Sequence, residues 1–156
     1  MIVLDTNSFS SVFDSDCSDN CEFRFVLQWV LNQNHACFVF GGSKYKSEIK
    51  KIIKYLKLIS ELQKAGKFVE INCEMIDDYA KELKGICTDK VFNDEHLVSI
   101  LNISGCKLLC TKDIEAMPYI KRKDFYFDQK IPRIYSGARN RDLLNVNYIV
   151  ELKNKC

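Results

Sequence analysis

Residues 1–7 read MIVLDTN, and this stretch decides the fold. An apolar run as short as residues 1–4 is typical of a strand that is buried on both faces, as in a parallel sheet. Asp5 follows at once, where the strand leaves the core. In open α/β sheets the ligand binds at this edge. Asp5 is therefore the first candidate for a functional residue.

Short apolar runs recur along the chain and alternate with patterns of helical period. Further strands are predicted at residues 36–42, 67–71 and 106–111, and helices at residues 22–33, 46–67, 74–84 and 93–104. We expect the long helix at 46–67 to begin at Ser47, to end at Gly66 and to bury one apolar stripe. The stripe consists of Ile49, Ile52, Ile53, Leu56, Ile59 and Leu62. This alternation predicts an α/β fold, a three-layer α/β/α sandwich around a central parallel sheet.

The length and composition fit one globular domain spanning residues 1–156. The chain is 47% hydrophobic and 28% charged, which is enough apolar sequence for a core. Residues 1–117 form the predicted core. Residues 118–156 form a basic C-terminal extension, with possible edge strands at 124–130 and 148–152 and a basic loop at 134–144. The sequence shows neither a bilayer-length apolar run nor a signal-peptide pattern, so we expect a cytoplasmic protein with no membrane partner.

Eight cysteines raise the question of disulfides or zinc. The chain contains no C-x-x-C pair, and neither His35 nor His96 completes a zinc-type spacing with a cysteine. A chain of this size and without a secretory signal needs no disulfide framework. We expect reduced thiols that are either small buried hydrophobic side chains or incidental.

The charges are segregated along the chain. Residues 1–22 carry five acids and no base, and residues 44–67 carry eight lysines against two acids. This pattern is typical of an acidic centre with basic flanks that hold an anionic partner, although solvated helix faces explain the lysines equally well. The candidate nucleic-acid contacts are Lys44, Lys46, Arg133, Arg139 and Arg141.

Four acids fall at predicted strand carboxyl ends or helix amino ends: Asp5, Glu48, Asp94 and Asp113. In a parallel sandwich all four positions lie at one edge of the sheet. Carboxylates gathered there repel each other unless a cation neutralises them, and oxygen ligands of this kind suit Mg²⁺ or Mn²⁺. Such a centre can activate water for in-line hydrolysis of a phosphodiester. The sequence thus predicts a metal-dependent nuclease.

The segments IVLDTN, SEI, NDEHLV and LLCTKD, in this order, resemble the PIN domain, a ribonuclease fold found in many prokaryotic toxins of toxin–antitoxin pairs. The resemblance covers residues 1–117. It implies a metal-dependent endoribonuclease with RNA as substrate, Asp5, Glu48, Asp94 and Asp113 as the metal-binding acids, and supporting roles for Asn7 and Thr111. It also implies a cognate antitoxin as a possible partner, and a possible homodimer.

Several alternatives remain open at this stage. Glu95 stands next to Asp94, and helix geometry lets only one of them point inward; we expect Asp94. His96 is interpreted as an incidental surface residue. The chain is either an active ribonuclease, a catalytically inactive module that binds RNA or a partner, or a nuclease that uses the same site on DNA, since nothing in the sequence reads a 2′-hydroxyl.

Overall fold

The computed structural model describes residues 1–89 and 91–144. Five parallel strands form one sheet in the order β3-β2-β1-β4-β5. The strands are β1 (Ile2–Leu4), β2 (Phe38–Phe40), β3 (Phe68–Glu70), β4 (Leu108–Cys110) and β5 (Arg133–Tyr135). All three residues of β1, β2 and β4 are buried, as predicted for strands covered on both faces.

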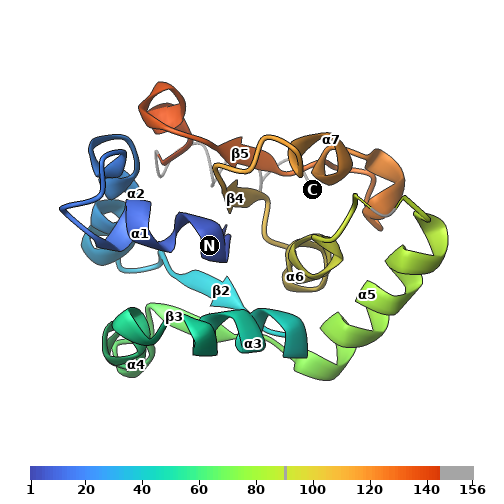
Figure 1. Cartoon of the computed structure of the whole chain (residues 1–156), viewed down its shortest axis with the longest axis horizontal. Helices are drawn as coiled ribbons and strands as arrows, with labels where there is room; N and C mark the ends of the chain where they lie inside the picture. Colours follow the sequence, from blue (N-terminus) through green and yellow to red (C-terminus); the bar gives the residue numbers. More distant parts are fainter. Residues whose placement is uncertain (90, 145–156) are drawn as a thin grey trace.

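Helices cover both faces of the sheet (Figure 1). The α-helices are α1 (Phe9–Phe13), α2 (Asn20–Asn32), α3 (Ser43–Lys51), α4 (Leu56–Lys64), α5 (Cys73–Ile86), α6 (Glu95–Ser104) and α7 (Met117–Ile120). Short 3₁₀ segments are η1 (Thr6–Ser8), η2 (Ile53–Tyr55), η3 (Lys123–Phe125) and η4 (Ala138–Leu144). Helices α1, α2 and α4 lie on one side of the strands, and α5 and α6 on the other. The architecture confirms the predicted α/β/α sandwich. Within the described residues, no helix has the length and apolar character needed to cross a membrane.

The register of the strands brings distant residues to one edge of the sheet. Leu4 pairs with Cys110, and Cys110 pairs with Tyr135, so β1, β4 and β5 end at the same level. The backbone N–H of Asp5 donates to the carbonyl of Cys110 at 2.9 Å, which extends the pairing by one residue. Asp5 and Thr111, the residues after β1 and β4, therefore lie side by side at the carboxyl edge.

The prediction of one long helix at 46–67 is wrong in three respects. It begins at Ser43 rather than Ser47, and it breaks at Ile52 into α3, η2 and α4. The expected single stripe also fails, because Ile53 is 76% exposed while Tyr55 is buried. In a straight helix Ile49 and Tyr55 would lie about 120° apart, at opposite margins of any buried face, whereas the break at Ile52 lets both be buried. The expected end holds: Gly66, at φ +67°, follows α4 and donates to the Gln63 carbonyl in a Schellman-type turn.

The C-terminal extension also differs from the expectation. Residues 124–130 form no strand: they contain the end of η3, and Phe125 and Tyr126 are both buried although they are adjacent. The edge strand is β5, which lies at the start of the segment predicted as a basic loop, and pairing with β4 supplies the register that its short sequence lacks. The predicted strand at 148–152 lies outside the described residues.

The cysteines divide between core and surface. Cys87, Cys106 and Cys110 are buried, as expected for small hydrophobic side chains. Cys21 is exposed.

Gly41 and Gly42 allow α3 to start close against α5, because a Cβ at either position would lie within 3 Å of the Ile76 side chain. Gly42 has φ +78°, and a Cβ built there would lie 2.7 Å from Cγ2 of Ile76, which is fully buried. We expect Gly42→Ala to lower the free energy of unfolding by about 2 to 4 kcal/mol, since left-handed strain and overpacking add. Gly85→Ala is the matched control, because a Cβ at this exposed position in α5 meets nothing within 4 Å. Urea denaturation measures both, and a Gly42→Ala protein as stable as wild type would contradict the packing described here.

Candidate functional site

Asp5 occupies the centre of the carboxyl edge and is 5% exposed. Its Oδ2 accepts a hydrogen bond from the Thr111 hydroxyl at 2.6 Å, and its Oδ1 accepts from the backbone N–H of Asn7 at 3.2 Å. Burial raises the pKa of Asp5 above its usual value, although both hydrogen bonds lower it, and the neighbouring Asp113 raises it further. Thr111 thus supports Asp5 through its side chain, as expected. Asn7 supports it through its backbone.

Asp113 lies three residues after β4, and its side chain caps the turn that follows. Its Oδ1 accepts from the backbone N–H groups of Glu115 and Ala116 at 2.9 and 3.1 Å, while its own N–H donates to the Thr111 hydroxyl at 3.0 Å. Thr111 therefore binds both Asp5 and Asp113, so one hydroxyl sets the relative position of two predicted site residues.

Asp94 precedes α6 in the N-cap position, but its side chain makes no capping hydrogen bond. Burial raises its pKa to about 6, and repulsion from Asp5 and Asp113 contributes in the same direction. Three carboxylates that follow β1, precede α6 and follow β4 therefore interact electrostatically, as the sequence predicts.

Glu95 has different neighbours from Asp94. Its Oε1 lies 3.3 Å from Nζ of Lys44 and 2.9 Å from Nζ of Lys84, and the residue is 1% exposed. Burial raises the pKa of Glu95, but the two lysines outweigh this effect and leave the pKa below its usual value. Of the two adjacent acids, Asp94 is the one whose pKa responds to Asp5 and Asp113, which favours Asp94 as the site residue.

Glu48 reaches the edge from α3. Its Oε2 accepts from the Thr6 hydroxyl at 2.8 Å and lies 3.3 Å from Nε2 of His96. Partial burial raises the pKa of Glu48, but His96 and Thr6 outweigh this effect and hold the pKa below its usual value. Glu48 is therefore ionised more readily than Asp5 or Asp94, and its charge is balanced by different groups.

Helix α3 is fixed to the rest of the fold at two points. The Tyr45 hydroxyl, fully buried, donates to the carbonyl of Leu4, the residue before Asp5. At the start of the helix, the backbone N–H and hydroxyl of Ser43 donate to the Asp77 carboxylate at 2.7 and 2.5 Å. These contacts tie the position of Glu48 to β1 and to α5.

The predicted nucleic-acid contacts do not gather in one place. Lys44 lies beside the acids, where it donates to the Asn93 carbonyl and to Glu95. Lys46 forms an ion pair with Glu70 at 2.6 Å. Arg141 packs its guanidinium over the Phe25 ring.

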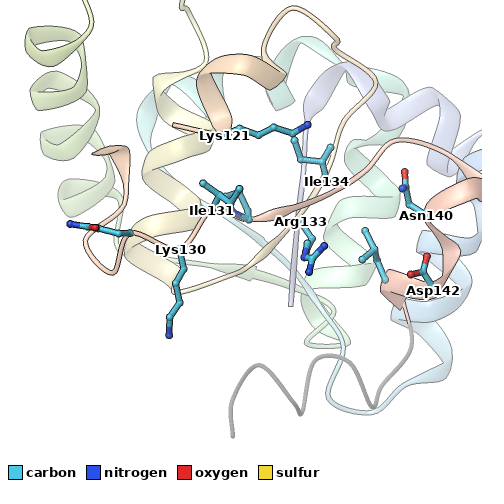
Figure 2. A pocket seen from close by; sticks show the side chains of 10 residues that line it. Lys121, Lys130, Ile131, Arg133, Ile134, Asn140 and Asp142 are labelled. Atoms are coloured by element: carbon cyan, nitrogen blue, oxygen red, sulfur yellow. The ribbon is translucent and has the colours of Figure 1, made fainter. Parts of the chain in front are cut away.

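Arg133 lies at the opposite end of the sheet from the acids, because it is the first residue of β5. It lines a pocket of about 740 Å³ together with Lys121 and Asp142 (Figure 2). Arg139 is exposed in η4, the segment that follows β5. A nucleic acid that touched every predicted basic residue would have to extend from one end of the sheet to the other.

The donor chemistry of the acidic edge fits Mg²⁺ or Mn²⁺, because Asp5, Glu48, Asp94 and Asp113 offer oxygen only. Burial and mutual repulsion raise the pKa values of Asp5 and Asp94, which is the condition that a bound cation relieves. Within residues 1–89 and 91–144, however, no three His, Cys, Asp or Glu side chains are arranged to hold a metal ion as they stand. A metal would have to draw these carboxylates closer together.

Sequence reasoning missed two partners of Glu48, namely Thr6 and His96. His96 is 3% exposed, so the interpretation as a surface residue is wrong. One signal was present: residues 97–101 read LVSIL, which leaves α6 with no strongly polar face after its first turn. A helix that is apolar all round is buried, and a histidine within its first turn is buried with it. No such pattern marks Thr6.

The chain matches no protein-family model, no curated protein and no solved structure.

Proposed function

We propose that this protein is a metal-dependent endoribonuclease that hydrolyses RNA phosphodiester bonds at the carboxyl edge of its sheet. The observation that carries the proposal is that Asp5 and Asp113 both contact the Thr111 hydroxyl at the carboxyl edge, and that Asp94 lies close enough to both for their charges to raise its pKa. Stability alone gives no reason to gather repelling carboxylates in a partly buried place. The likeness of IVLDTN and LLCTKD to PIN-domain motifs supports RNA as the substrate.

The roles of the residues follow from their surroundings. Asp5, Asp94, Asp113 and Glu48 would hold Mg²⁺ or Mn²⁺, which when bound activates water and stabilises the leaving oxygen. Thr111 fixes the orientation of Asp5 through its 2.6 Å hydrogen bond. Lys44, whose charge lowers the pKa of both Asp94 and Glu48, is the cation best placed to contact a phosphate beside the acids.

The proposal is tested by incubating the protein with end-labelled single-stranded RNA and with DNA of the same sequence, in Mg²⁺, in Mn²⁺ and in EDTA. We expect internal cleavage of the RNA in either metal and none in EDTA. Cleavage of DNA alone would keep the site and overturn the substrate. RNA that is bound in all three conditions and never cut would identify an inactive binding module instead.

A further inference from the structure

His96 is a buried side chain whose polar atoms lack full hydrogen bonds. It is 3% exposed, and neither Nδ1 nor Nε2 has an aligned hydrogen-bond partner. Leaving a buried polar group in this condition costs roughly 1–3 kcal/mol, so a leucine of similar volume would suit the core better. The residue therefore calls for an explanation other than stability.

The neighbours of His96 suggest such an explanation. Its Nε2 lies 3.3 Å from Oε2 of Glu48, and the same oxygen accepts the Thr6 hydroxyl at 2.8 Å. Thr6 comes from η1, directly after β1, and His96 comes from the first turn of α6. Two different elements thus flank one carboxylate oxygen, and among the described residues Oε1 of Glu48 makes no hydrogen bond or ion pair.

We infer that His96 and Thr6 are positioning residues, which hold Oε2 of Glu48 so that Oε1 is kept for the metal. The inference rests on the function proposed above. The neutral imidazole with its proton on Nε2 is sufficient for this role. Partners that orient a metal-binding side chain in this way typically change metal affinity by about 10- to 100-fold.

The first test compares His96→Leu with His96→Gln by calorimetric titration of the metal-free protein with Mn²⁺. Leucine removes the donor at nearly constant volume, and we expect Mn²⁺ affinity to fall by about 10- to 100-fold while the thermal unfolding temperature is kept or raised. Glutamine places an amide N–H close to the position of Nε2, so we expect it to retain affinity within about threefold. His35→Leu and His35→Gln, at an exposed position, are the matched controls, and we expect neither to change the affinity for Mn²⁺.

Thr6 supplies a second, independent pair. We expect Thr6→Val to weaken Mn²⁺ binding and Thr6→Ser to preserve it, because only the hydroxyl contacts Glu48. The double variant of Thr6→Val and Glu48→Gln should be no weaker than Glu48→Gln alone, since both changes act through one side chain.

The outcomes separate the two proposals. Wild-type protein that binds Mn²⁺ and cuts RNA, with His96→Leu and Thr6→Val binding equally well, would overturn the positioning roles alone. Wild-type protein that binds no Mn²⁺ and cuts no RNA would overturn both. The inference is supported if His96→Leu folds but binds Mn²⁺ more weakly, while His96→Gln binds it like wild type. If His96 were merely structural, both variants would instead be less stable than wild type.

Discussion

Asp5→Asn is expected to lower the rate of RNA cleavage by at least about 100-fold and to leave the fold intact. The asparagine keeps the size of the side chain: its one oxygen can accept from the Asn7 N–H, and its amide N–H can donate to the Thr111 hydroxyl, which then acts as acceptor. It removes the negative charge at the centre of the site, and a loss of about 3 kcal/mol in transition-state stabilisation corresponds to roughly 100-fold in rate. Because burial already raises the pKa of Asp5, losing this charge relieves the folded state.

The measurement is the initial rate of cleavage of labelled RNA at saturating Mn²⁺, with circular dichroism to confirm folding. Asp78→Asn is the matched control, since Asp78 is an exposed residue of α5 that pairs only with Lys81 among the described residues. We expect the control to cleave at the wild-type rate. Equal rates for Asp5→Asn and wild type would refute the assignment of the site to this edge.

Asp94→Asn is expected to stabilise the metal-free protein at pH 7 by about 1 to 3 kcal/mol. The folded-state pKa of about 6 lies above the usual value of 3.8, so between these two values the folded protein binds more protons than the unfolded chain. Stability from this group is therefore full below pH 4 and is lost as the pH rises through 6. At 1.36 kcal/mol per pKa unit the loss reaches about 3 kcal/mol, and partial solvent contact reduces it.

Asparagine does not ionise and is as good an N-cap as aspartate, so the substitution removes the penalty without a new cost. Urea denaturation in EDTA should show a gain at pH 7 that shrinks to nothing at pH 4. Asp124→Asn is a control of opposite sign, since its ion pair with Arg122 lowers the pKa of Asp124 and its removal destabilises at pH 7. A pH-independent difference between Asp94→Asn and wild type would contradict this account.

The parts of the fold that could be predicted are those in which local pattern and tertiary burial agree. Residues 2–4 and 108–110 are apolar runs bounded by polar residues, and both became buried central strands. Parallel topology then places Asp5 and Asp113 at one edge without further information. The acids that follow β1 and β4 were predictable because their positions depend on the sheet alone.

The errors arise where distant contacts override local periodicity. Nothing near Ile52 signals a break, because the cause is the burial of Tyr55 against Phe9 and Phe13 of α1. Strand β5 is only three residues long and begins with an arginine, so its register comes entirely from β4. The position of Glu48 between Thr6 and His96 also depends on distant contacts, because α3 reaches the edge through its contacts with β1 and α5.

The hydrogen bond between Thr111 and Asp5 joins residues that are 106 positions apart in the chain. During synthesis a ribosome adds roughly 5 to 20 residues per second, so β4 is synthesised on the order of 10 s after β1 and can pair with it only then. Parallel pairing over such a separation is also intrinsically slow. A nascent chain therefore carries Asp5 and Glu48 without Asp113, and a premature stop before residue 108 yields a polypeptide that lacks β4 and with it the pairing that places Thr111 beside Asp5. The proposed site is therefore assembled only once translation of the core is nearly complete.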